Sequence, residues 1–294
     1  MRRLVLIHGR SQQRKDAADL KQEWVQALHN GLTNAGVNAT VPEDRIRFPY
    51  YGDTLYHLAE GLPDDAPDVI VKGYGELAPG EERFIAEVVG EAVQRLGIDE
   101  EDIRAAAGQP DVIQKGVRNW PWVLAALRAI DRSPGLAGAS LQLVTRDVYR
   151  YLHYIGIQTQ IDDGVRKAIT SDEENVVVAH SLGSVVAYNV LKRDAEELKW
   201  KVPALVTLGS PLAIAPIAQK LRPVSRPHGV RVWFNAFDPR DVVALRPLDR
   251  ERFPVTPEVE NFNQIRNETS HHHGIVGYLE HPEVALRIYR TLVQ

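Results

Sequence analysis

A serine in the stretch VVVAHSLGSVVAY has the surroundings of a nucleophile. Residues 179–183 read Ala-His-Ser-Leu-Gly, so a small residue stands two positions before Ser181 and another two positions after it. Small residues at these positions allow a strand to turn sharply into a helix, which leaves the serine in a strained conformation with its hydroxyl exposed. The simpler alternative is a serine that only caps a helix after a buried strand.

Histidines and aspartates that could activate this serine follow it in the chain. A serine hydroxyl is a weak nucleophile at its own pKa, so it needs a base, and the base needs an anion that fixes its tautomer. The run SHHHGIVGYL holds histidines at 271–273, and WFNAFDPRDVVA offers Asp238 and Asp241 at the end of an expected strand. Neighbouring side chains of an extended loop point to opposite sides, so His272 and His273 cannot both face Ser181. These residue types indicate acyl transfer.

Metal chemistry is a weaker interpretation of the histidine run. Adjacent histidines cannot converge on one ion, and no His-x-x-x-His spacing accompanies them. The chain has no cysteine, which excludes disulfides, thiolate catalysis and Cys-ligated metals. We therefore expect neither a metal ion nor a cofactor, and we interpret His8 and His180 as structural residues.

The elements that must position these residues alternate between strands and helices. Each is indicated by an apolar run, by helical spacing of apolar residues, or by a closing glycine or proline. The expected strands are 4–9, 37–42, 175–181, 204–211 and 229–238, and the expected helices are 19–36, 182–198 and 281–293. Strands separated by helices of this length predict an α/β fold with a mostly parallel sheet and right-handed crossovers.

A helical segment from about 60 to 155 interrupts this alternation. Helices are expected in it at 80–96, 99–107, 120–131 and 139–153. Residues 60–110 hold thirteen acidic against four basic side chains, a poor surface for docking on anionic lipid. At 294 residues the chain can form one large α/β unit, so we expect a single domain over 1–294 that contains this acidic helical insertion.

Composition and the N-terminus limit the partners. The chain holds 35 basic and 39 acidic residues, a net charge of −4, which argues against nucleic acid as the main partner. The apolar run in MRRLVLIHGR is too short for a signal peptide or a membrane span. We therefore expect a cytoplasmic protein with a small-molecule partner and no integral membrane segment.

The motifs taken together resemble the α/β-hydrolase superfamily, and its serine lipase/esterase branch in particular. The resemblance is carried by IHG at 7–9, AHSLGS at 179–184, TLGSPL at 207–212, FNAFDPRDVVA at 234–244 and HHHGIVGYL at 271–279, in the order that the superfamily has. It covers residues 1 to about 55 and 160–294. It implies an α/β-hydrolase fold, a mostly parallel central sheet flanked by helices, with residues 60–155 as a helical cap. The usual N-terminal antiparallel pair of strands is absent.

The resemblance also implies roles for individual residues. Ser181 corresponds to the nucleophile. Asp241 precedes two valines, as in the superfamily's Asp-x-Val pattern, and is favoured as the acid over Asp238. Aligning HGIVGYL on lipase-like relatives favours His273 as the base over His272.

The backbone N–H groups of Leu182 and Arg10 would form the oxyanion hole, which stabilises the tetrahedral intermediate. Trp120, Trp122 and Tyr51 are candidates for substrate contact, although packing onto the core is the commoner role of such aromatics. The function implied is a serine hydrolase that cleaves carboxylic esters, lipid-like ones among them. A thioesterase or acyltransferase would use the same residues, and a binding or signalling protein could retain the fold without the chemistry.

Overall fold

The computed structural model describes residues 1–9, 16–51, 79–107, 119–133 and 136–294. Within them, a sheet of six strands forms the centre of the molecule, in the order β2-β1-β3-β4-β5-β6, and every neighbouring pair is parallel. The strands are β1 (Arg3–Ile7), β2 (Ile46–Arg47), β3 (Glu174–His180), β4 (Lys201–Leu208), β5 (Val232–Ala236) and β6 (Glu260–Phe262). The predicted mostly parallel α/β sheet is confirmed.

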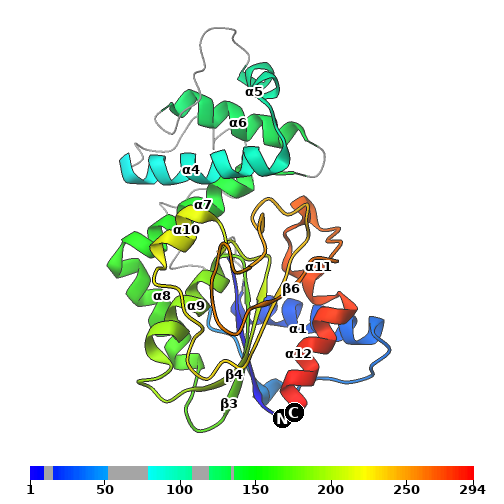
Figure 1. Cartoon of the computed structure of the whole chain (residues 1–294). Helices are drawn as coiled ribbons and strands as arrows, with labels where there is room; N and C mark the ends of the chain where they lie inside the picture. The colour runs from blue at the N-terminus through cyan, green and yellow to red at the C-terminus, as the bar shows by residue number, and fades with distance from the viewer. Residues whose placement is uncertain (10–15, 52–78, 108–118, 134–135) are drawn as a thin grey trace.

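Helices cover both faces of this sheet, which explains why its inner strands are apolar runs without alternation. Alternate strand residues, such as Leu4 and Val176, pack against α1 (Ala17–Asn34), α11 (Ile275–Leu279) and α12 (Pro282–Val293). The residues between them, such as Val5 and Val177, face α8 (Ile155–Ala168) and α9 (Leu182–Asp194). Figure 1 shows the two helical layers on opposite sides of the sheet.

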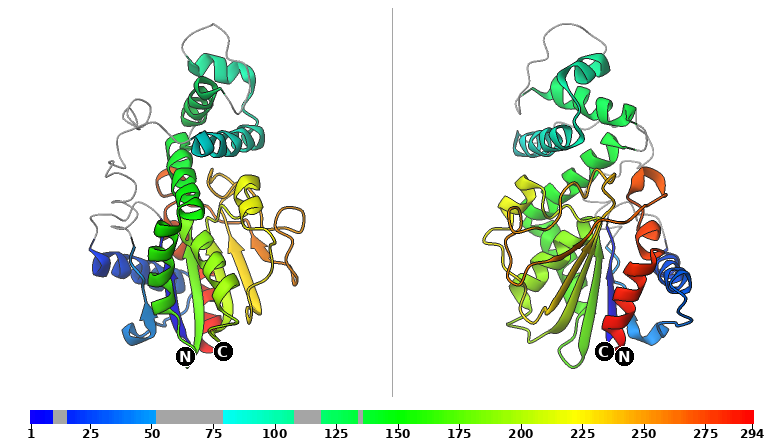
Figure 2. Two further views of the ribbon diagram at one scale, coloured as in Figure 1. Left: turned by 90° about the vertical axis from the view of Figure 1, so that its left-hand side faces the viewer. Right: turned by 45° about the vertical axis from the view of Figure 1, so that its right-hand side comes forward.

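Three further helices lie beyond the carboxyl ends of the strands. They are α4 (Pro79–Leu96), α5 (Glu100–Ala107) and α6 (Trp120–Arg132), called here the α4–α6 layer, and both views of Figure 2 show the layer above the sheet. The long helix α7 (Gly138–His153) connects the layer to the sheet side of the molecule. Arg146 of α7 forms a buried ion pair with Glu81 of α4, with 2.9 Å between Nε and Oε1.

A second tie joins the α4–α6 layer to α10 (Ala215–Lys220). Glu91 of α4 accepts a hydrogen bond from the Ala215 N–H at 2.9 Å and pairs with Arg246 at 3.3 Å. Ala215 is the first residue of α10, so the Glu91 carboxylate satisfies one of the N–H groups that a helix start leaves without an intrahelical partner. The layer is thus anchored at two separate points.

Two features of the predicted element pattern are wrong. Residues 37–42 do not form a strand: Pro42 precedes a short 3-10 turn (Glu43–Arg45), and β2 follows at Ile46–Arg47. A proline has no N–H to give to a ladder, which disfavours a strand through Pro42. The predicted helix 182–198 ends at Asp194 instead.

Sequence reasoning also missed α8, α10, α11 and β6. Ile157, Ile161 and Val165 of α8 recur every four residues and are buried, a pattern that could have revealed the helix. The strand β6 has only three residues and could not be recognised from alternation. No helix of the described ranges is both long and apolar enough to cross a membrane.

Candidate functional site

The sharp turn between β3 and α9 holds Ser181 in an unusual backbone conformation. Its φ is +54° and its ψ is −129°, a region that residues other than glycine rarely occupy and that costs about 1–3 kcal/mol. The Ser181 N–H donates to the Leu208 carbonyl at the end of β4, which ties the turn to the neighbouring strand. Such strain persists only where the surrounding structure holds it, as it does here.

The close approach of the start of α9 to the end of β1 explains why Gly183 stands two residues after the serine. A Cβ on Gly183 would lie 2.4 Å from the carbonyl oxygens of both Ile7 and His8, at the end of β1. A Cβ on Gly9 would come within 2.9 Å of the Ser181 Cβ. The serine is also more enclosed than predicted: Ser181 is only 2% exposed, because the end of β1 and His273 pack against it.

A hydrogen-bonded chain runs from this serine to an aspartate. The Oγ of Ser181 lies 2.8 Å from Nε2 of His273, and Nδ1 of the same ring lies 2.7 Å from Oδ2 of Asp241. A carboxylate only accepts, so Nδ1 carries the hydrogen and Nε2 is free to accept the proton of the Ser181 hydroxyl. The His273 side chain is 15% exposed and that of Asp241 is fully buried, so the chain is largely shielded from water.

The Asp241 carboxylate is held by two further donors. Its Oδ1 accepts from the Val243 N–H at 2.9 Å, and its Oδ2 accepts from the Tyr278 hydroxyl at 2.6 Å. The Asp241 N–H donates to the Asp238 carbonyl, which closes a turn just after β5. Both carboxylate oxygens are therefore fixed before any substrate binds.

The alternative residues point elsewhere. Asp238 accepts from the Arg240 side chain at 2.8 Å and from the Asn267 N–H at 2.7 Å. Burial disfavours its charge, but these donors outweigh burial and lower the pKa of Asp238. His272 donates from Nδ1 to the Asn267 carbonyl at 2.7 Å. The structure thus brings His273 and Asp241 to the serine, and places His272 and Asp238 around Asn267.

A tight turn decides which histidine reaches Ser181. The sequence prediction assumed an extended loop, but residues Ser270–His272 form a 3-10 turn with positive φ values of +61° at His271 and +57° at His272. Such values favour glycine or asparagine, and no residue pattern in SHHHG announces them.

Two other histidines lie close to the serine. His180 donates from Nε2 to the His273 carbonyl at 2.8 Å, and the centroids of the His180 and His273 rings are 4.7 Å apart. Burial, and next to it the neighbouring His273, lower the pKa of His180 far below its usual value, so the ring is neutral. His8 is fully buried, and burial lowers its pKa to about 4. Sequence reasoning assigned both to structural roles and missed the contact of His180 with the His273 carbonyl.

The remaining candidates are those for the oxyanion hole and for substrate contact. Leu182 is the first residue of α9, directly after Ser181, where a helix N–H has no intrahelical acceptor. Arg10 lies outside the described residues. Tyr51 is buried, donates its hydroxyl to the His8 carbonyl and gives its N–H to His8 Nε2 at 3.0 Å, so it fastens the end of β1.

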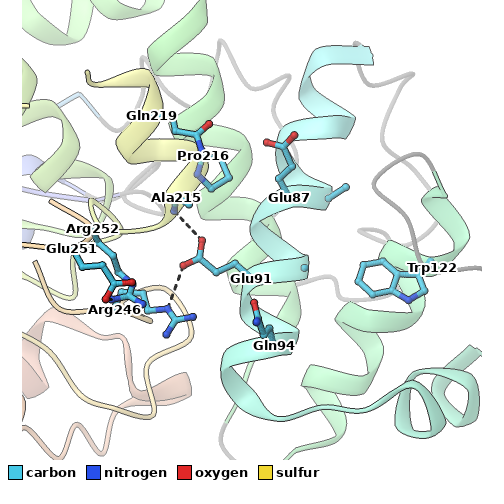
Figure 3. Close-up of a pocket in the computed structure, with 12 residues that line it drawn as sticks. Glu87, Glu91, Gln94, Trp122, Ala215, Pro216, Gln219, Arg246, Glu251 and Arg252 are labelled. Atoms are coloured by element: carbon cyan, nitrogen blue, oxygen red, sulfur yellow. Dashed lines mark hydrogen bonds and ion pairs between the residues drawn. The ribbon is translucent and has the colours of Figure 1, made fainter. Parts of the chain in front are cut away.

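The two tryptophans belong to the α4–α6 layer. Trp120 is partly buried against the core, and Trp122 is 2% exposed. Trp122 lines a cavity of about 620 Å³ between α4, α10 and the segment 246–252. Figure 3 shows Glu91 in this cavity, pointing from α4 toward Ala215 and Arg246. Ser181 and its partners are not among the residues that line this cavity. In the described ranges no cluster of three or more His, Asp or Glu side chains could hold a metal ion.

The chain matches no protein-family model and no curated protein. What the site can do therefore follows from its own geometry. A hydroxyl, an imidazole and a carboxylate in series can move a proton from Ser181 Oγ to His273 Nε2, while the carboxylate stabilises the resulting cation.

Proposed function

We propose that the protein is a serine hydrolase that cleaves carboxylic esters. The observation that carries this proposal is the series of hydrogen bonds from Ser181 through His273 to Asp241, at 2.8 and 2.7 Å. Two distances in hydrogen-bond range, a base oriented by a third group, and a nucleophile on a strained turn are together the signature of an activated serine.

The fold supports the same proposal. The six-stranded order, with the serine after the central strand β3 and the aspartate after β5, is compatible with an α/β-hydrolase core. Sites of open parallel sheets lie at the carboxyl ends of the strands, where all three side chains are found. In this proposal the chain is a single hydrolase domain, and the α4–α6 layer is its cap.

The proposed reaction proceeds in two steps. The Ser181 oxygen attacks the ester carbonyl carbon while His273 Nε2 takes its proton, and the carbonyl π electrons move onto the oxygen. The C–O bond to the alcohol then breaks, and His273 returns the proton to the leaving oxygen. Water next attacks the acyl-serine with His273 as base, which releases the acid and restores the Ser181 hydroxyl. Asp241 stays ionised and stabilises the imidazolium.

The tetrahedral oxyanion needs N–H donors. The Leu182 N–H at the start of α9 is our first candidate, with the helix N-terminus adding favourable potential, and the Arg10 N–H is the second. Ser181 is only 2% exposed, so the size of the acyl group is a natural variable to test. Short and long acyl chains, lipid-like ones included, are therefore compared in the assay below.

Replacing Ser181 by alanine tests the proposal. With p-nitrophenyl esters of short and long acyl chains, S181A should lose at least about 10³-fold in kcat. Ser171→Ala removes an exposed hydroxyl that precedes the start of β3, whereas Ser181 follows the end of this strand, and it should retain wild-type turnover. Peptide mass spectrometry after treatment with a fluorophosphonate should find the label on Ser181. Undiminished turnover in S181A, or a folded wild-type protein that never labels there, would contradict the proposal, and the second result would favour a binding protein.

A further inference from the structure

Tyr278 makes a contact with the acid that the three-residue chain does not include. It lies on α11, five residues after His273, and is fully buried. Its hydroxyl donates to Asp241 Oδ2 at 2.6 Å and accepts from the Asp238 N–H at 3.3 Å. A phenol has one hydrogen to donate, and here it is directed at the carboxylate oxygen that also faces His273.

Tyr278 and His273 donate to the same oxygen of the Asp241 carboxylate. Asp241 Oδ2 accepts from both His273 Nδ1 and Tyr278, while Oδ1 accepts from a backbone N–H. The neighbouring arginine, Arg240, pairs with Asp238 and Glu268 instead. A buried carboxylate must be satisfied by hydrogen bonds or by a nearby opposite charge. The described hydrogen bonds to Asp241 come from the His273 ring, the Tyr278 hydroxyl and a backbone N–H.

Local packing is arranged around the same pair of side chains. A Cβ on Gly209 would come within 3.1 Å of both Asp241 Oδ2 and the Tyr278 ring, and Gly209 has a φ of +54°, which favours glycine. The pair therefore fills the space beside the end of β4 closely. Burial, and then the adjacent Asp241 charge, raise the pKa of Tyr278, so its hydroxyl keeps its hydrogen at working pH.

We propose that Tyr278 is a positioning residue: its hydroxyl holds Asp241 Oδ2 in line with His273 Nδ1. This inference rests on the proposed serine hydrolase function, because it concerns the acid of that reaction. The hydroxyl acts through Asp241 and does not contact the substrate. Its removal should therefore lower kcat and leave KM nearly unchanged.

Tyr278→Phe removes only this oxygen, and Tyr188→Phe is its matched control. Tyr188 is also fully buried, and its hydroxyl donates to the Ser225 carbonyl at 3.2 Å, away from the acid. We expect Y278F to lose about tenfold to a hundredfold in kcat, the range of one hydrogen bond to a charged group, with KM within about twofold. Y188F should keep kcat within about twofold, and the two variants should lose similar thermal stability.

A double-mutant cycle separates positioning from a general structural effect. In the D241N background the Tyr278→Phe change should cost less than about twofold, because its target carboxylate is gone. Equal losses in both backgrounds, a Y278F loss no greater than that of Y188F, or failure of Y278F alone to fold would each overturn the inference. If S181A retains full turnover, the proposed function itself fails, which is a different result from any of these.

Discussion

Adding one methyl group at Gly183 should disturb both the fold and the proposed chemistry. Gly183 lies on the first turn of α9, two residues after Ser181, and faces the end of β1. A Cβ there would lie 2.4 Å from two carbonyl oxygens, those of Ile7 and His8. These are backbone atoms of a strand held in the sheet between β2 and β3, so they cannot turn aside as a flexible side chain would.

The size of the effect follows from these distances. Side-chain Cβ atoms essentially never approach closer than 3.0 Å, so α9 and β1 must separate by at least about 0.6 Å. Overpacking of this kind costs about 1–3 kcal/mol, and the better helix propensity of alanine returns about 0.5–1 kcal/mol. We therefore expect Gly183→Ala to lower the free energy of unfolding by about 1 kcal/mol, and by no more than about 2.5 kcal/mol.

The same displacement should reach the serine. Ser181 moves with the start of α9, whereas His273 is held by a separate loop, so the 2.8 Å contact between Oγ and Nε2 is stretched. Misplacing reacting groups by about an ångström can cost roughly a hundredfold in rate. For about 0.6 Å we expect a kcat loss of about tenfold or more, with a similar slowing of fluorophosphonate labelling.

Gly164→Ala supplies the matched control. Gly164 lies in α8, where an added Cβ meets no atom within 4 Å. The change should raise the free energy of unfolding by about 0.5–1 kcal/mol and leave kcat unchanged. Urea unfolding and ester turnover measured on both variants decide the matter. Wild-type stability and kcat in G183A would show that the turn is not under the constraint described.

Two further predictions concern the histidines of the 270–273 turn and Asp238. His273→Ala should lose at least about 10³-fold in kcat, whereas His272→Ala, whose ring only donates to the Asn267 carbonyl, should stay within a few-fold; equal losses would mean that the loop has another register. Asp238→Asn should lose about 1–2 kcal/mol of stability at pH 7, because Arg240 then loses a charged acceptor. The folded pKa of Asp238 lies below its unfolded value of 3.8, so this stabilisation is present above pH 3.8 and is lost as pH falls through the folded pKa. Urea unfolding should therefore show the gap between wild type and D238N closing toward acid pH, and a constant gap would contradict it.

The apolar patterns of the sequence were sufficient for the architecture where each element is long. Leu20, Trp24, Leu28 and Leu32 recur every four residues, and they are the buried face of α1. The β-branched run before Ser181 is the central strand β3. Short elements were not predictable, since β2 and β6 exist because neighbouring strands offer free edges rather than because of their own two or three residues.

For the candidate site, the sequence by itself determined which chemical groups occur, their order along the chain, and the small residues that the turn at Ser181 requires. Only the tertiary structure decided which groups meet. The positive φ values at 271 and 272 turn His273 toward a serine 92 residues earlier. The Arg240 side chain donates to the Asp238 carboxylate, whereas Tyr278 donates to Asp241. Periodicity records how each segment buries its own apolar face. Contacts between distant polar side chains depend on how the packed elements lie relative to one another, which no local pattern encodes.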